Sequence, residues 1–209
     1  MCTYWPDSSL NSIFSKVKEK WGAFSNMGNG FPIYANGRKI LNTEALYQSC
    51  RFPYHPGVQR EILMQKSGMA SKMISKKYIE HTRPDWRDVR VDVMRFCIEL
   101  KLSQHEYELG PILNDTGDTH IVEKSHNDNF WGTIWDEDHG MYIGQNVLGK
   151  LYDELRYKYR EHNSSDWVSF EPDSFKFITQ IDIPYFWLFG ENITPVSYLQ
   201  IQSLDLKPL

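Results

Sequence analysis

The sequence predicts an α+β fold in which helices predominate, with short strands near the N-terminus. Two long segments, residues 83–104 and 146–160, repeat apolar residues every three or four positions, as one face of an amphipathic helix does. Residues 12–21 instead alternate with a period of two, which is typical of a short strand. Asn36-Gly37 lies between two apolar runs and therefore predicts a β-hairpin turn.

The longest predicted helix opens at Pro84, because proline fits the first helical position and Asp85 suits the positive N-terminal end. Its apolar residues form one stripe that faces the core, namely Val89, Val93, Cys97 and Leu100. Its arginines share another face, namely Arg83, Arg87 and Arg90. An arginine face of this kind is able to hold a pyrophosphate group.

Shorter elements fill the remainder of the first 160 residues. A helix begins near Asn42 or Thr43 and ends by Phe52, because Pro53 follows. Further short helices are expected at residues 58–66, 69–81 and 107–113, with a brief strand at 120–125. Residues 126–145 are expected to form one long loop rich in glycine and aspartate.

The character of the chain changes after Arg160. Residues 162–174 have the composition of a linker, and the aromatic, β-prone run that follows ends near Gly190. We therefore expect a main domain at residues 1–160 and an extension at residues 161–209 that packs on it.

Composition excludes several classes of function. The three cysteines are widely separated and the seven histidines are scattered, so we expect no metal site, no disulfide framework and a reducing compartment. No motif for a bound cofactor is present, and no apolar run is long enough to span a membrane, so we expect a cytoplasmic protein without a cofactor or a membrane partner. The net charge of −4 argues against a basic surface that grips long DNA, so a nucleic acid would have to be met locally.

Charge is nevertheless unevenly placed. Residues 60–90 hold eight Lys or Arg against four acids, whereas residues 106–138 hold nine acids against one Lys. Two solvated faces explain this pattern as well as a basic wall for phosphates opposite an acidic loop that works on a sugar.

Three clusters place polar residues beside glycine and tryptophan. In the first, Lys16, Lys18 and Lys20 alternate along the predicted strand, and crowded ammonium groups lower a lysine's pKa enough for it to act as a nucleophile. The alternative is a charged edge strand that resists aggregation. Gly22 and the following Ser25, Asn26 and Met27 are candidates for a turn that offers backbone N–H groups to a ligand.

The second cluster is Glu44 with Tyr47 and Gln48, which lie three and four positions later on the same helical face. These side chains suit a sugar or a base. A first-turn acid that favours the helix dipole, or a buried packing node, is the alternative.

The third cluster is the run from Ser125 to Gly149. Asp128 precedes Trp131 and Gly132 in a predicted loop, and Asn146 is expected to cap the helix that follows.

Together these clusters occur in the order and spacing of the NADAR family of N-glycosidases, which the chain resembles from about Ser12 to about Tyr159. The motifs are F-S-K…W-G-A-F-S-N-M, T-E-A-L-Y-Q, V-R-V-D-V-M-R…K, D-T-G-D…I-V-E-K-S…D-N-F-W-G and G-Q-N-V-L-G-K-L. The variants EALYQSCRFP and SNM resemble the branch that acts on ADP-ribosylated guanine. That branch implies the removal of ADP-ribose from guanine bases of DNA or RNA, which reverses the action of a DNA ADP-ribosyltransferase toxin.

The resemblance also implies roles for single residues. The family's acid matches Glu44, its Asp-x-x-Trp-Gly matches Asp128, Trp131 and Gly132, and its Gly-x-Asn matches Gly144 and Asn146. It further implies a lysine that forms a Schiff base with the opened ribose, for which Lys16 is placed best and Lys18 and Lys20 compete.

Two other functions remain open. In the other branch of the family, the substrate is a phosphoribosylamino-pyrimidine of riboflavin synthesis. A non-catalytic reader of ADP-ribose is the third alternative.

Overall fold

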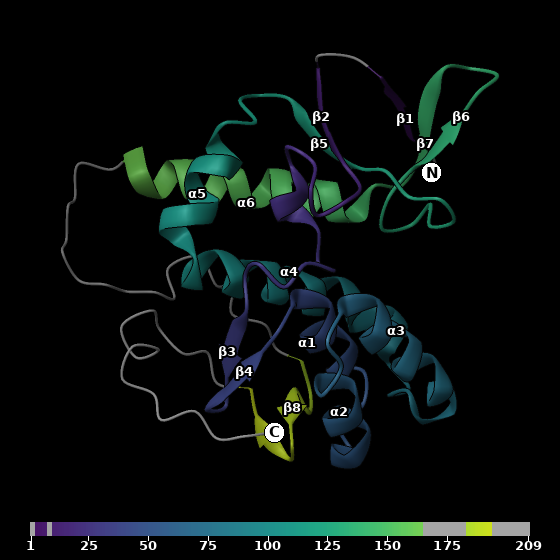
Figure 1. The fold of residues 1–209 in the computed structure, drawn as a ribbon, viewed down its shortest axis with the longest axis vertical. Helices are drawn as coiled ribbons and strands as arrows, with labels where there is room; N and C mark the ends of the chain where they lie inside the picture. The colour runs from purple at the N-terminus through teal and green to yellow at the C-terminus, as the bar shows by residue number, and fades with distance from the viewer. Residues whose placement is uncertain (1–2, 8–9, 165–182, 194–209) are drawn as a thin grey trace. The chain divides into compact units, whose positions relative to one another are not determined.

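The computed structural model describes residues 3–7, 10–164 and 183–193. The chain separates into two compact units, Met1–Ser25 with Tyr107–Ser169 and Asn26–Glu106 with Phe170–Leu209. Both units mix helices with short strands, so the predicted α+β fold is confirmed (Figure 1). Within the described ranges, no helix is long and apolar enough to cross a membrane.

The first unit combines two small sheets with a long helix. Strands β1 (Thr3–Pro6), β7 (Met141–Gly144) and β6 (Ile134–Asp136) form an antiparallel sheet in the order β1-β7-β6. Strand β2 (Asn11–Phe14) pairs in parallel with β5 (His120–Glu123), and α6 (Val147–Ser164) packs on β5. The short η1 (Gly22–Phe24) brings Phe24 onto Tyr152 of α6, with ring centroids 4.9 Å apart. Helix α5 (Glu106–Asn114) starts at the boundary of the units.

The second unit is mainly helical. Its helices are α1 (Thr43–Ser49), α2 (Pro56–Leu63), α3 (Gly68–Lys77), η2 (Ile79–His81) and α4 (Trp86–Gln104). Its strands are the hairpin β3 (Ile33–Ala35) and β4 (Arg38–Ile40) and the hairpin β8 (Trp187–Leu188) and β9 (Glu191–Asn192). Helix α1 lies at the centre of this unit, because it packs against α2, α3 and α4.

Local signals in the sequence explain the starts of these elements. The Asn42 side chain accepts the backbone N–H of Ala45 at 2.9 Å, which caps α1, and Ser67 caps α3 in the same way. In the turn of the β3-β4 hairpin, Asn36 and Gly37 have φ angles of 49° and 68°, which few residues other than asparagine and glycine adopt readily. The predicted hairpin and the start of α1 are therefore confirmed.

Helix α4 differs in part from the prediction. Val93, Cys97 and Leu100 are fully buried and Val89 is partly buried, so the apolar stripe is confirmed. The helix begins only at Trp86, however. Arg83 precedes it and makes a two-pronged ion pair with Asp85, at 2.6 and 2.8 Å, so Arg83 does not share a helical face with Arg87 and Arg90.

Two further expectations are wrong. Residues 126–145 are not one loop, because they contain β6 and β7, and β7 pairs with β1 from the far N-terminal end of the sequence. The linker expected from residue 162 is wrong at its start, because α6 continues to Ser164.

Residues 183–193, the described part of the expected C-terminal extension, belong to the second unit. The Gln59 side chain donates to the Trp187 carbonyl at 2.8 Å and accepts the Phe189 N–H at 2.7 Å, which ties β8 to α2. Residues 165–182 and 194–209 lie outside the described residues, and the domain boundary at residue 160 stays a prediction.

Candidate active site

Glu44 lies in the first turn of α1 and is only 5% exposed. Its backbone N–H donates to the Asn26 carbonyl at 3.0 Å, and its Oε1 accepts the amide N–H of Gln48 at 2.8 Å. The Gln48 Oε1 in turn accepts the Ser75 hydroxyl at 2.5 Å. Because Ser75 donates, the Gln48 amide presents its NH₂ group to Glu44, and that donor stabilises an ionised carboxylate.

Tyr47 stands beside this carboxylate as a neutral phenol. Its ring packs against Trp86 with centroids 5.1 Å apart. Burial raises the pKa of Tyr47 well above its ordinary value, the negative charge of Glu44 raises it further, and the positive charge of Arg90 opposes the change. A phenol that stays protonated is a hydrogen-bond donor at neutral pH.

Gly68 allows α3 to start directly against Glu44. A Cβ at this position would lie 2.8 Å from Met27 Cα and 3.1 Å from Glu44 Cβ, so only glycine permits the approach without displacement. Next to Met27 in the sequence lies Asn26, whose Nδ2 is 3.1 Å from the sulfur of Met94. The Asn26 Oδ1 is buried and has no hydrogen-bond partner among the described residues, which marks it as an acceptor open to a ligand.

The predicted arginines divide between two environments. Arg90 is half-buried, and its charge acts on Tyr47, so it belongs to the cluster around Glu44. Arg87 is exposed in the first turn of α4.

Lys16, Lys18 and Lys20 belong to the first unit. The expectation that they share one face of a strand is wrong. Strand β2 ends at Phe14, and the chain turns because the Glu19 carboxylate accepts the backbone N–H groups of Ser15 and Lys16 at 2.8 and 3.0 Å. Only glycine fits at position 22, where this turn closes, because a Cβ there would lie 2.1 Å from the Val17 carbonyl oxygen.

All three lysines are exposed on this turn. The Lys20 ammonium lies 4.2 Å from the centroid of the Trp21 ring, a cation–π contact. Ser25 is buried and ends the first segment of the same unit, whereas Asn26 and Met27 belong to the other unit. Lys16 and Lys18 remain the predicted nucleophiles.

The loop around Trp131 is built from turn contacts within the first unit. Asp128 Oδ1 accepts the backbone N–H groups of Phe130 and Trp131 at 3.0 and 2.9 Å. Two glycines allow the backbone to close behind this loop, because a Cβ on Gly132 or Gly144 would lie 2.7 or 2.5 Å from a carbonyl oxygen. These contacts give the residues a structural role, and their binding of substrate stays a prediction.

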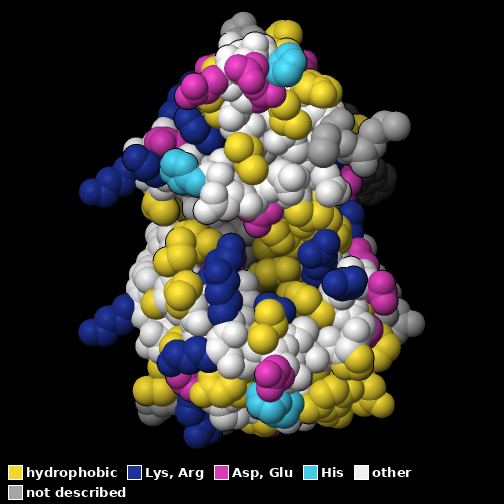
Figure 2. Space-filling view, turned by 90° about the vertical axis from the view of Figure 1, so that its right-hand side faces the viewer, with side chains coloured by type: hydrophobic (Ala, Val, Ile, Leu, Met, Phe, Trp, Pro, Cys, Tyr) yellow, Lys and Arg dark blue, Asp and Glu magenta, His cyan; other side chains and the backbone are white. Residues whose placement is uncertain are grey.

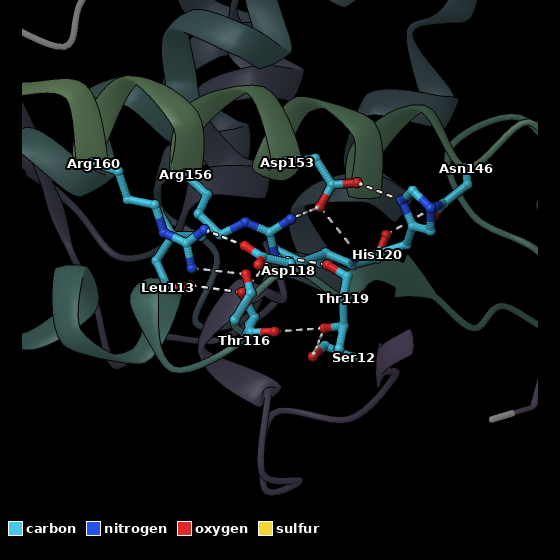
Figure 3. A network of polar contacts seen from close by, with 12 residues as sticks. Ser12, Leu113, Thr116, Asp118, Thr119, His120, Asn146, Asp153, Arg156 and Arg160 are labelled. Carbon is cyan, nitrogen blue, oxygen red and sulfur yellow. Dashed lines mark hydrogen bonds and ion pairs between the residues drawn. The ribbon is translucent and has the colours of Figure 1, made fainter. Parts of the chain in front are cut away.

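Asn146 directly precedes α6, but its side chain does not cap this helix, so the predicted cap is wrong. The side chain instead fastens α6 to β5. Its φ angle is 51°, its Nδ2 donates to the Ile121 carbonyl at 2.8 Å, and its Oδ1 accepts the Glu123 N–H at 3.0 Å. Asp153, about two turns further along α6, accepts the Ile121 N–H at 3.1 Å and pairs with Arg156 at 3.0 Å. Figure 3 shows this network, which holds β5 along the helix.

Comparison with known proteins places these residues in one family. Residues 4–160 match the NADAR domain. The chain belongs to the NADAR domain family. It is similar to the N-glycosidase YbiA of Escherichia coli, with 32% identity over 150 residues that cover 72% of this chain and 88% of YbiA.

A solved NADAR structure supports the fold directly. The NMR structure of Escherichia coli YbiA superposes with a TM-score of 0.63 at 26% identity, covering 76% of this chain and 90% of YbiA. A riboflavin biosynthesis protein of Vibrio vulnificus is 32% identical over 183 residues, which are 87% of this chain. The chain spans about half of that relative's length, 48%.

Sequence reasoning missed two residues that contact the Glu44 cluster, Gly68 beside Glu44 and Ser75 beside Gln48. Both lie with Ser71 on one face of α3, at spacings of three and four residues, so the small-residue stripe was the available signal for a close helix contact. The structure brings together residues of the second unit, namely Asn26, Met27, Glu44, Tyr47, Gln48 and Arg90. The lysines and the Trp131 loop are predicted site residues of the first unit.

Proposed function

We propose that this protein is an N-glycosidase that removes ADP-ribose from guanine bases of DNA or RNA. The observation that carries the proposal is the buried Glu44 carboxylate, held by the Gln48 amide at 2.8 Å beside a neutral phenol. Relatives named as N-glycosidases support the reaction class. The resemblance of the EALYQ and SNM segments to the guanine-directed branch supports the substrate, a product of DNA ADP-ribosyltransferase toxins.

The residues suit the cleavage of a ribose C1–nitrogen bond. Positive charge develops on the ribose as this bond breaks, and an ionised Glu44 stabilises it. Tyr47 is a neutral donor for a ribose hydroxyl or for the purine. The buried acceptor of Asn26 adds a site for a hydroxyl or amino group of the substrate.

A lysine attack completes the proposed reaction. The neutral amine of Lys16, or of Lys18, bonds to ribose C1 while the C1–nitrogen bond breaks, and the leaving guanine takes a proton. Opening of the ring then gives a protonated imine. Water hydrolyses this imine, which releases ADP-ribose and regenerates the lysine, so the net reaction consumes one water.

Borohydride trapping tests the proposal. The protein is incubated with an ADP-ribosylated guanine oligonucleotide and reduced, and peptide mass spectrometry is expected to find an ADP-ribose adduct on Lys16 or Lys18. Lys39, an exposed lysine of the β4 strand, is the internal control and is expected to stay unmodified. Free ADP-ribose without any lysine adduct would refute the Schiff base, and absence of both would refute the function.

The second candidate is an N-glycosidase of phosphoribosylamino-pyrimidine intermediates of riboflavin synthesis. It is favoured by the names of the relatives from Vibrio vulnificus and Arabidopsis thaliana, both riboflavin biosynthesis proteins. Separate incubations discriminate the two: this candidate predicts turnover of the pyrimidine intermediate and an untouched ADP-ribosylated oligonucleotide.

A further inference from the structure

Helix α3 has two faces of opposite character. Gly68, Ser71 and Ser75 are buried: Gly68 contacts Glu44, and Ser75 donates to Gln48. The outer face follows the same helical spacing and consists of Met69, Lys72, Met73 and Lys76, with Lys77 beside them. Met69 and Met73 are 58% and 52% exposed.

Positive charge is concentrated around this outer face. Residues 60–77 contain five Lys or Arg and one acid, Glu61, in a chain whose net charge is −4. Glu61 is already engaged, because it accepts the Tyr78 hydroxyl at 2.5 Å and pairs with Lys77 at 3.5 Å. Lys72 and Lys76 therefore carry most of the uncompensated charge of the helix.

Methionine is concentrated at the same place. Of the methionines in the described part of the chain, the three that are exposed are Met64, Met69 and Met73. Methionine side chains are flexible and polarizable, so they adapt to irregular apolar surfaces. Figure 2 views the side on which α3 lies in Figure 1, and its lower half shows lysine and arginine next to hydrophobic side chains.

We propose that the outer face of α3 binds the strand of nucleic acid that carries the modified guanine. This proposal rests on the proposed function and names the part of the protein that holds its macromolecular substrate. Lys72 and Lys76 are one helical turn apart, a rise of about 6 Å, and are suited to phosphates of one strand. Met69 and Met73, on the same face, offer apolar contact to sugars or unstacked bases.

The helix also relates this surface to the candidate site. An α-helix with its side chains is about 10–12 Å in diameter, so a strand held on the outer face lies roughly one helix diameter from Glu44 on the inner side. Contacts with phosphates position a substrate without reading its sequence. A surface of this kind suits an enzyme that must accept modified guanine in different sequences.

The pattern fits a polyanionic strand better than a membrane. Helices that lie on lipid bilayers separate a continuous apolar face, often with aromatic residues, from a basic face. Helix α3 instead alternates methionine and lysine on one face, spans about 15 Å and contains no aromatic residue.

Binding of an unmodified, fluorescein-labelled single-stranded oligonucleotide tests the surface independently of catalysis. Fluorescence anisotropy is measured over a series of salt concentrations for the wild type and for K72Q/K76Q. Loss of two phosphate contacts is expected to reduce the magnitude of the slope of log association constant against log salt by about 1.4. This corresponds to about 25-fold weaker binding at 0.1 M salt if the two proteins bind equally at 1 M. The matched control, K39Q/K150Q, removes the same charge from exposed positions elsewhere and is expected to bind like the wild type.

Activity on two substrates separates this proposal from the proposed function. K72Q/K76Q is expected to cleave ADP-ribosylated guanosine normally and to show a raised KM for the modified oligonucleotide. A wild type that binds DNA but cleaves neither substrate refutes the proposed function alone. The surface is refuted if K72Q/K76Q and K39Q/K150Q bind DNA equally, or if the wild type floats with phosphatidylserine vesicles and does not bind DNA.

Discussion

Replacing Ser75 with alanine removes the hydroxyl that donates to Gln48 Oε1 at 2.5 Å. Ser75 is fully buried and Gln48 is 5% exposed, so the amide oxygen loses this donor in a place that water does not readily reach. A buried polar atom left unsatisfied costs about 1–3 kcal/mol, and we expect the free energy of unfolding to fall by that amount. The Gln48 amide also loses the contact that fixes its orientation, so its NH₂ group no longer points reliably to Glu44.

The variant should therefore lose activity as well as stability, and the two effects need separate measurements. Urea denaturation gives the free energy of unfolding, and release of ADP-ribose at saturating substrate gives kcat for the fully folded fraction. Ser71→Ala is the matched control, because Ser71 is equally buried on α3 but donates to the Ile62 carbonyl at 3.1 Å. We expect both variants to be destabilised and only Ser75→Ala to lose kcat. Equal kcat values in the two variants would refute the positioning of Glu44 by Ser75 through Gln48.

Two further predictions concern stability. Gly68→Ala is expected to lower the free energy of unfolding by about 1–3 kcal/mol, because the new Cβ meets Met27 Cα at 2.8 Å. The control is Gly57→Ala, whose Cβ meets nothing within 4 Å, and an unchanged urea midpoint for Gly68→Ala would contradict this packing. Burial lowers the pKa of Lys101 from 10.5 to about 7, so between these values the unfolded chain binds a proton that the folded protein does not, and stability rises with pH above about 7. The rise is expected to approach 1.4 kcal/mol per pH unit in denaturation curves and to vanish in Lys101→Met, so parallel pH profiles of the two proteins would contradict it.

Features that depend on neighbouring residues could be predicted from the sequence. The cap of α1 by Asn42 and the Asn36-Gly37 hairpin require only a short side chain and a tolerated positive φ at the right position. The apolar stripe of α4 follows from helical periodicity alone. The same local logic placed Glu44 in a first helical turn, and the resemblance to a family marked it as an acid of interest.

Features that depend on distant contacts could not be predicted. Ser75 meets Gln48 across 27 positions, and nothing near either residue announces the pairing. Local composition predicts loop where β7 forms, because the partner strand β1 lies far away near the start of the sequence. Periodicity alone predicts too long a strand at β2, because the alternation continues to residue 21. The backbone instead turns after Phe14, where the Glu19 carboxylate accepts two backbone N–H groups.

The central claim, that the Glu44 cluster is the active site of an ADP-ribosyl-guanine glycosidase, is tested most directly by Glu44→Gln. This change keeps the size of the side chain and removes its charge, and equal thermal unfolding of the two proteins would establish that the variant is folded. The rate of ADP-ribose release from a modified guanine oligonucleotide is then compared. We expect the variant to be slower by at least about 100-fold. Release at the wild-type rate would contradict the account.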